Sequence, residues 1–249
     1  MKWGEQRWPQ MKALDRSKIV TILPTGSMEQ HGPHLPLQVD HFIANRIAED
    51  LETRMPEILT LPPVWAGTSG HHMDFPGTIT LRPRVFIDML RDICACMHAH
   101  GFRRMILLNG HGGNRASLQV LGQELYAEMG FSINLIVYWD LVPALVKSLK
   151  KSKSKGMGHS GELETSLMLY LAPQLVDLSA LPDGFRSDQL HHSRFISGEG
   201  ITRYVNIKEH SEIGVDGFPA AASPTDGELS DRTDLTELEK VVRELQHEA

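Results

Sequence analysis

Short apolar runs alternate with longer amphipathic segments between residues 19 and 139, and this alternation limits the possible folds. The short runs are rich in β-branched residues and are bounded by proline or glycine, as buried strands are. Predicted strands cover residues 19–26, 58–65, 103–115 (ending in a glycine turn) and 132–139, and predicted helices cover 41–54, 83–100 and 116–129. The pattern predicts an α/β fold, a three-layer sandwich in which helices cover both faces of a mostly parallel central sheet.

The second half of the chain is less regular. Lysines between Lys147 and Lys155 alternate with serine and glycine, which predicts a solvated loop over residues 147–158. The alternative is a mobile lid whose positive charge attracts an anionic substrate. We expect a short helix from 158 to 171, irregular chain with weak strand signals near 201–207, and a final helix over 234–246.

Composition narrows the class of protein. The 249 residues contain 41% hydrophobic residues, which suits one globular domain over residues 1–249. A net charge of -6 argues against a general nucleic-acid or anionic-membrane surface. Residues 1–9 lack the apolar core of a signal peptide, and no apolar run approaches the length of a membrane span. The only cysteines, Cys94 and Cys96, lie two apart in a predicted helix, so we expect no disulfide and a reducing, cytoplasmic location.

The loop after the first strand carries the first candidate site. Glu29 and His31 lie two apart in an extended segment, so their side chains can face one point, and Asp40 follows nine residues later. A carboxylate and an imidazole aimed at one point suit a divalent metal ion, with His34 as a spare ligand. The alternatives are a polar connecting loop and, for Asp40, a role as the N-cap of the next helix.

Two further clusters contain histidine. His111 lies among glycines at the end of a predicted strand, where it could bind a metal while the backbone N–H groups of Gly112 and Gly113 bind an oxyanion. The alternative is a glycine-rich turn. His159 precedes Glu162 and Glu164 at a helix start, where both acids are favoured by the helix dipole, so only one is expected to bind metal. The same dipole keeps His159 neutral and usable as a base.

A fourth polar loop spans residues 67–78 and contains His71 and His72. Histidines in surface loops are usually neither ligands nor bases, and we expect His71 to follow that rule. For His72 the sequence leaves a site role and a structural role open.

The four motifs, taken in order, resemble the creatininase (creatinine amidohydrolase) family. They are Glu29-Gln-His-Gly-Pro-His-Leu-Pro36 with a later Asp40, then Phe75-Pro-Gly-Thr78, Asn109-Gly-His-Gly-Gly-Asn114 and His159-Ser-Gly-Glu-Leu-Glu-Thr-Ser166. The resemblance is clear over about residues 17 to 171. It implies an α/β sandwich, one or two divalent metal ions and a homo-oligomer, often a hexamer.

The resemblance also implies a role for each matching residue. Glu29 and His111 would hold one ion, His31 and Glu164 the other, and Asp40 would bridge them. His159 corresponds to the family's acid–base histidine, and Ser69 lies near its substrate-contacting loop position. We add His72, Gly112 and Gly113 as candidate substrate contacts. Histidine and carboxylate ligands without cysteine suit zinc, manganese or iron.

Two departures from the family concern its creatinine pocket. Members that hydrolyse creatinine carry a glutamate two residues after the glycine-flanked histidine, where this chain has Gly113. They also carry a Trp-Asp pair just before the acid–base histidine, where this chain has Lys-Ser-Lys155-Gly-Met-Gly. The metal-binding motifs therefore resemble the family, while the creatinine pocket does not.

We therefore predict a metal-dependent hydrolase of a non-peptide C–N bond in a small cyclic or linear amide other than creatinine. The alternative reactions are hydrolytic ring opening of a cyclic keto compound, such as a keto-inositol, and trimming of a modified peptide. A different class, a non-catalytic metal-binding assembly protein, would need the ligands but no free base at His159. The expected partner is a small-molecule substrate, with neither nucleic acid nor membrane involved.

Overall fold

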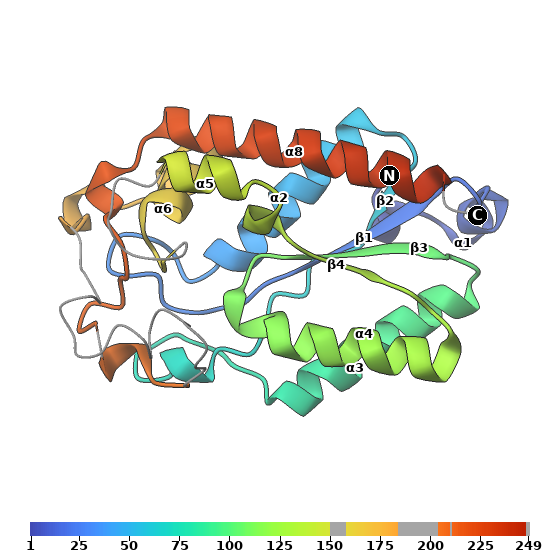
Figure 1. Ribbon diagram of the computed structural model, residues 1–249, viewed down its shortest axis with the longest axis horizontal. Coiled ribbons are helices and arrows are strands. Elements are labelled where there is room, and N and C mark those ends of the chain that lie inside the picture. Colours follow the sequence, from blue (N-terminus) through green and yellow to red (C-terminus); the bar gives the residue numbers. More distant parts are fainter. Residues whose placement is uncertain (150–157, 184–203, 210, 248–249) are drawn as a thin grey trace.

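The computed structural model describes residues 1–149, 158–183, 204–209 and 211–247. A four-stranded sheet in the order β2-β1-β3-β4 runs through the molecule (Figure 1), and every pair of neighbouring strands is parallel. The strands are β1 (Val20–Thr25), β2 (Ile58–Thr60), β3 (Arg104–Asn109) and β4 (Asn134–Val137). The predicted α/β class is confirmed, and the described sheet is wholly parallel.

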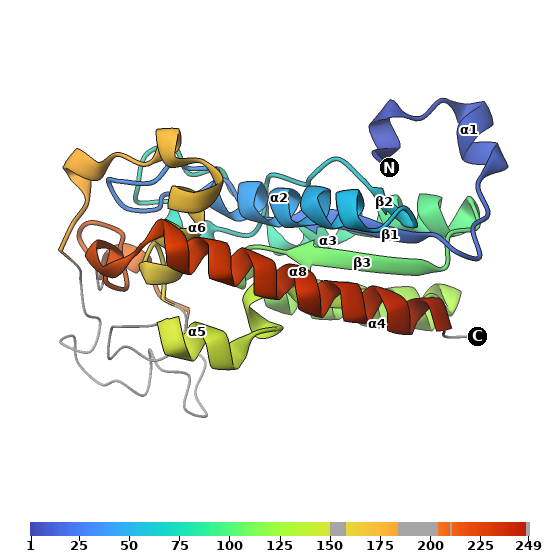
Figure 2. The ribbon, with the colours of Figure 1, turned by 90° about the horizontal axis from the view of Figure 1, so that it is seen from above.

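Helices cover both faces of this sheet, as Figures 1 and 2 show. The helices on one face are α2 (Val39–Arg54), α5 (Pro143–Leu149), α6 (Glu162–Leu171) and α8 (Pro224–His247), and those on the other are α3 (Pro83–Ala99) and α4 (Arg115–Met129). A short helix α1 (Trp8–Ala13) precedes β1. The described 3-10 helices are Trp3–Glu5, Gly70–His72, Gly112–Asn114, Tyr138–Asp140, Pro173–Leu175, Leu178–Ala180, Ile207–Glu209 and Pro219–Ala221.

The core has two halves because strand side chains alternate between the faces of the sheet. Val20 and Ile22 of β1 pack among the residues of α2, α6 and α8, whereas Leu23 packs among those of α3 and α4. Burial on both faces explains why β1 reads as a continuous apolar run in the sequence. None of the helices in the described part of the chain has both the length and the apolar character that a membrane crossing requires.

The strand register brings the candidate site together. Thr25, the last residue of β1, pairs with Asn109, the last residue of β3. Since the strands are parallel, the loops that follow them leave the same edge of the sheet. These loops carry the Glu29 and His111 motifs.

Three predicted elements differ from the structure. The last helix begins at Pro224 rather than near residue 234, because its first turns bury the polar residues Ser230, Asp231 and Asp234, which hide the apolar periodicity. The strand predicted over 58–65 ends at Thr60, just before two prolines that lack an N–H group. The weak strand signal is wrong for residues 204–207, and 201–203 lie outside the described residues.

The lysine-rich segment is described only in part. Lys147 lies in the last turn of α5, a helix that the sequence pattern did not predict. Residues 150–157 lie outside the described part of the chain, so the loop and lid predictions stay untested there.

Candidate metal centre

Five carboxylate and imidazole side chains meet where the loops leave β1 and β3. Glu29 and His31 come from the loop after β1, His111 follows β3, and Glu164 lies in the first turn of α6. Asp40 is the second residue of α2, and the N-cap position is Gln38, so the N-cap interpretation of Asp40 was wrong. All five side chains belong to residues that are at most 3% exposed.

The five residues form two groups of donor atoms that share Asp40. In one group, His111 Nδ1 lies 3.3 Å from Glu29 Oε2 and 3.0 Å from Asp40 Oδ2. In the other, His31 Nε2 lies 3.1 Å from Asp40 Oδ1 and 3.7 Å from Glu164 Oε1. Within each group the donor atoms lie within 4.8 Å of one another. One carboxylate therefore faces both groups with different oxygens.

Backbone carbonyls decide which nitrogen of each ring faces the carboxylates. His31 Nδ1–H donates to the main-chain oxygen of Glu29 at 3.1 Å, and His111 Nε2–H donates to that of Thr68 at 3.2 Å. A carbonyl oxygen only accepts, so the opposite nitrogen of each neutral ring carries the lone pair. Fixing a ligand's tautomer through its outer nitrogen is a common feature of metal sites.

The electrostatics of the cluster favour a cation. Burial disfavours the charged form of both His31 and His111, but the neighbouring carboxylates outweigh burial and raise the pKa of each ring well above its usual range. Burial likewise opposes ionisation of Glu29, yet nearby His111 holds the pKa of its carboxyl well below normal. Asp40 Oδ2 is buried and accepts no hydrogen bond, and the nitrogen that faces it at 3.0 Å, His111 Nδ1, carries the lone pair when the ring is neutral. These donors, nitrogen and oxygen without sulfur, fit a divalent ion.

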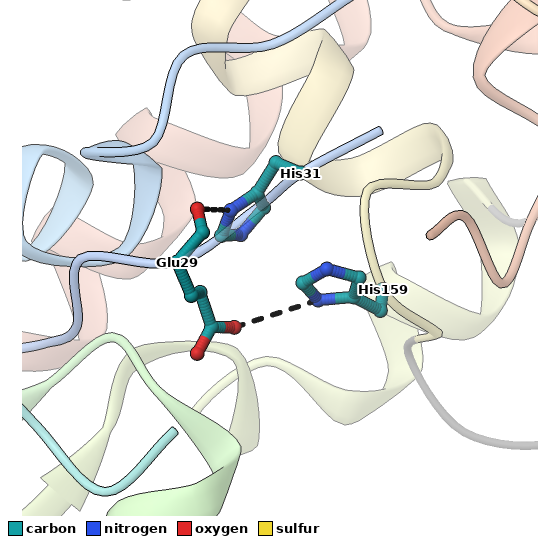
Figure 3. A group of neighbouring side chains, drawn as sticks. All are labelled: Glu29, His31 and His159. Atoms are coloured by element: carbon teal, nitrogen blue, oxygen red, sulfur yellow. Dashed lines mark hydrogen bonds and ion pairs between the residues drawn. The ribbon is translucent and has the colours of Figure 1, made fainter. Parts of the chain in front are cut away.

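His159 lies against this cluster from a different segment. Its backbone exchanges two hydrogen bonds of 2.8 Å with Asp216, which fixes the residue just before α6. Its ring stands beside His31, with centroids 4.4 Å apart, and faces the Glu29 carboxylate (Figure 3). Nε2–H donates to the main-chain oxygen of Gln30 at 2.9 Å, which leaves Nδ1, 3.7 Å from Glu29 Oε1, to accept a proton. Burial, aided by nearby His31, lowers the pKa of this ring.

The structure separates the two acids of α6. Glu164 Oε2 accepts from the backbone N–H of Ser160 at 2.5 Å, so its other oxygen faces His31. Glu162 Oε2 accepts from the backbone N–H of Phe218 at 3.0 Å. Ser160, which lies between His159 and α6, has a φ of 55°, which is uncommon for a residue other than glycine.

The other candidate residues surround the cluster. His34 Nε2 pairs with Thr165 Oγ1 at 2.9 Å, and the ring of His71 stacks on His111 with centroids 5.7 Å apart. His72 is buried, and its Nε2 lies 3.3 Å from Glu29 Oε1. Ser69 is fully buried behind His111, where its hydroxyl contacts Ser27 Oγ and His111 Nε2. Substrate contact by Ser69 stays a prediction.

A pocket with a volume of about 320 Å³ opens over the donors. Its walls include Gly112, Gly113 and His72 among the candidate contacts, together with Trp139 and Arg115. Arg115 forms an ion pair with Asp140 and lies over the Trp139 ring, 5.5 Å from its centroid. The sequence motifs did not indicate Trp139 or Arg115, because they lie outside all four histidine clusters.

Gly113 has no room for a side chain. A Cβ atom there would lie 2.4 Å from His111 Nε2 and 2.7 Å from the main-chain oxygen of Thr68. Both distances are shorter than real contacts, so a glutamate at this position would displace the His111 ring. The departure at position 113 is therefore built into the packing of the loop.

An amide network holds the loops, and sequence reasoning assigned no role to its members. Asn114 Nδ2 donates at 3.0 Å to the main-chain oxygen of Gly26 and to Asn109 Oδ1, while its Oδ1 accepts from Thr68 N–H at 2.9 Å. Asn109 Nδ2 donates to the carbonyl of His111 at 2.6 Å. The sequence signal was present, since both asparagines flank the glycine turn, but their partners lie far away in the chain.

Comparison with known proteins gives one consistent group. A family model described as "Creatininase: Creatinine amidohydrolase" matches residues 4–245. A creatinine amidohydrolase of Pseudomonas putida is 33% identical over 196 residues, which cover 72% of this chain and 75% of that protein. A mycofactocin precursor peptide peptidase of Mycobacterium ulcerans (strain Agy99) is 30% identical over 217 residues, or 83% of this chain and 77% of that protein.

A third relative is a 3-dehydro-scyllo-inosose hydrolase of Thermotoga maritima, 33% identical over 171 residues, or 62% of this chain and 51% of that protein. Among solved structures, one described as "Creatininase Mn" is 29% identical with a TM-score of 0.82, covering 98% of this chain and 97% of that one. A mutant creatininase of "Zn-Zn type" is 28% identical, with the same TM-score of 0.82 and the same coverage of 98% and 97%.

Proposed function

This chain belongs to the creatininase family, and from that premise we propose that it is a metal-dependent hydrolase of a C–N bond in a small cyclic or linear amide other than creatinine. The observation that carries the proposal is the position of Asp40, whose two oxygens face two separate groups of donors. A single carboxylate shared between two ligand sets would suit a pair of divalent metal ions.

We assign Glu29 and His111 to one ion, His31 and Glu164 to the other, and Asp40 to both. Zinc and manganese suit these donors, as does iron, and two similar structures are described as a manganese and a zinc form. When bound, such ions polarise a carbonyl group and lower the pKa of water towards neutrality.

His159 is the proposed acid–base residue. Its Nε2 is committed to the Gln30 carbonyl, and its Nδ1 faces the cluster, so a proton can be taken up and given back at Nδ1. The lowered pKa of the ring keeps this nitrogen unprotonated at neutral pH. A general acid–base residue contributes typically about 10²–10⁴-fold in rate. His159 also lies within ligand distance of Glu29 and His31, so it could instead be a metal ligand. The metal content of a His159 variant distinguishes an acid–base residue from a ligand.

The pocket above the donors would receive the amide. We propose that the backbone N–H groups of Gly112 and Gly113 face the developing oxyanion and that His72 and Ser69 support this side of the pocket. A glutamate is absent at position 113, and the segment 150–158 contains no aromatic residue. Trp139 in the pocket wall instead offers one apolar face. These differences support a substrate other than creatinine.

Two other reactions stay open because of the relatives. The mycobacterial relative is described as a peptide peptidase, and the Thermotoga relative as an inosose hydrolase. The carbonyl group that bound metal ions would polarise could equally be that of a peptide bond or of a cyclic ketone. A non-catalytic metal-binding assembly protein would have no use for a proton acceptor at His159 Nδ1.

A substrate panel with two variants tests the proposal. Zinc- or manganese-loaded protein is assayed on cyclic amides, formamides, keto-inositols and short peptides, and we expect turnover of an amide. His159→Ala should lose about 10²–10⁴-fold in kcat while it retains its metal, and Asp40→Ala should lose metal. A His159→Ala protein without metal would make His159 a ligand, and an Asp40→Ala protein with full metal content would refute the shared-carboxylate assignment.

We also propose a cytoplasmic homo-oligomer, as in the hexamers expected for the family. Light scattering of the purified protein at several concentrations would give the mass of the assembly. A mass of 27.9 kDa, that of one chain, would contradict this part of the proposal.

A further inference from the structure

Gln30 lies between two proposed ligands, and its side chain has a fixed orientation. The amide oxygen accepts from the backbone N–H of Gly32 at 2.9 Å, and the amide nitrogen donates to the main-chain oxygen of Gly214 at 3.0 Å. A backbone N–H can only donate and a carbonyl can only accept, so these two contacts together determine which end of the amide is nitrogen. The residue is 5% exposed, and water has little access to the amide.

The second hydrogen of the Gln30 amide has two candidate acceptors. His72 Nδ1 lies 2.9 Å from Gln30 Nε2, and His159 Nε2 lies 3.0 Å from it. His159 Nε2 already carries the hydrogen that it donates to the Gln30 carbonyl, so it cannot accept another. The remaining acceptor is His72 Nδ1.

This contact determines the tautomer of His72. A ring whose Nδ1 accepts a hydrogen bond has no hydrogen on that nitrogen, so the ring is neutral and carries one hydrogen. Since Nδ1 accepts, the hydrogen is on Nε2, which lies 3.3 Å from Glu29 Oε1. The other carboxylate oxygen, Oε2, accepts from Ser27 Oγ at 2.8 Å and faces His111. Both oxygens of Glu29 are thereby held in place by neutral donors.

We propose that Gln30 and His72 form a positioning relay that orients the Glu29 carboxylate, and that His72 is not itself a metal ligand. The inference rests on the proposed function only where it treats Glu29 as a ligand. A ligating His72 would need an unprotonated Nε2, which the Gln30 amide prevents. Partners of this kind typically change metal affinity by about 10–100-fold.

The first test measures the tautomer in the metal-free protein. Two-bond proton–nitrogen NMR on histidine-labelled protein distinguishes a ring protonated at Nε2 from one protonated at Nδ1. We expect His72 to be a single Nε2–H tautomer, and Gln30→Met, which keeps the length of the side chain without its donor, to produce a mixture. A wild-type ring protonated at Nδ1, or an unchanged spectrum in Gln30→Met, would overturn the relay.

The second test measures zinc affinity by competition with a chromophoric chelator. Gln30→Met and His72→Leu should each weaken zinc binding about 10–100-fold, and the double variant should be no weaker than His72→Leu, because Gln30 acts on Glu29 through His72. His72→Gln should retain most of the affinity, since its amide can still donate to Glu29. Additive losses, or His72→Gln losing one zinc ion per chain, would contradict the proposal.

A matched control separates the relay from general damage. His34→Leu removes another buried histidine, which lies on the loop that carries Glu29 and Gln30 and whose Nε2 contacts Thr165 rather than the Glu29 side chain. It should bind zinc as tightly as the wild type, and thermal unfolding of the metal-free variants checks that each is folded. A His34→Leu protein weakened as much as His72→Leu would point to loop damage. Absence of zinc binding by the wild type would refute the proposed function, whereas the NMR result stands independently.

Discussion

Asp40 and Gly113 show how single positions shape the centre. Asp40 is held at the start of α2, where a carboxylate is favoured by the helix dipole, yet its oxygens face His31 and His111. Gly113 does the opposite and contributes no side chain, which lets the backbone pass close to His111. Asp40 contributes a carboxylate to the centre, whereas the missing side chain at Gly113 leaves room for the His111 ring.

A methyl group at Gly113 should disturb the centre. We expect Gly113→Ala to displace the His111 ring and change its position relative to Glu29 and Asp40, because the new Cβ would lie 2.4 Å from His111 Nε2. Zinc affinity should fall by at least about tenfold, as it does when the partners of a ligand are disturbed. Chelator competition gives the affinity. Gly112→Ala is the control, since a Cβ there meets nothing within 4 Å, and equal affinities for the two variants would contradict the steric argument.

Helix α8 buries two carboxyl groups that the centre does not use. Asp234 is fully buried and Asp231 nearly so, and each has an Oδ1 atom without a hydrogen-bond partner. Burial raises the pKa of Asp234 to about 8 and, with nearby Asp50, that of Asp231 to about 6. Ionisation of these two buried carboxyl groups therefore makes the free energy of unfolding depend on pH.

The sign of this dependence follows from proton binding. An unfolded aspartate has a pKa of about 3.9, so between about pH 4 and 8 the folded chain holds a proton at Asp234 that the unfolded chain releases. The contribution of Asp234 to the free energy of unfolding is therefore greatest below about pH 4, falls as pH rises towards about 8, and changes little above that.

Asp234→Asn should remove this loss. We expect the variant to be more stable than the wild type by on the order of a few kcal/mol at pH 8, with a smaller or reversed difference at pH 4. Urea unfolding at both pH values measures it. Asp92→Asn, which makes the same charge change at an exposed position of α3, is the control. A gain that is the same at pH 4 and pH 8 would show that ionisation is not the cause.

Across the whole molecule, the donors tie together elements from distant parts of the chain. They come from the loops after β1 and β3 and from the starts of α2 and α6, and the last of these packs against α8. Without a cation, three buried carboxylates lie close together at this junction. A bound ion would offset the repulsion between these carboxylates and would link the loops after β1 and β3 to helices α2 and α6.

Metal should therefore stabilise the entire fold. At a free zinc concentration 100 times its Kd, the expected gain is about 2.7 kcal/mol, which corresponds to a rise in Tm of roughly 5–10 °C for a chain of this size. Differential scanning calorimetry with zinc and with excess chelator measures the shift. Asp40→Ala should show little zinc-dependent shift. A wild-type Tm that does not respond to zinc would argue against a resident metal.

Several features of this protein could be predicted from short stretches of its sequence. The short apolar run at β1, rich in β-branched residues, indicated a buried strand, and the glycine turn after β3 was expected at the carboxyl edge of the sheet. Glu29 and His31 could be proposed as a pair because residues two apart in an extended chain share a face. These features depend on neighbours in sequence, which is why they were predictable.

Other features were decided only by the tertiary structure. Whether Asp40 caps a helix or faces His111, and whether Glu162 or Glu164 reaches the centre, depends on how α2 and α6 pack against the β1 and β3 loops. The role of Gln30 depends on Gly214, far away in the chain. The first turns of α8 were hidden because their buried face is polar. In each case the deciding contact joins residues distant in sequence, and local propensity carries no information about such contacts.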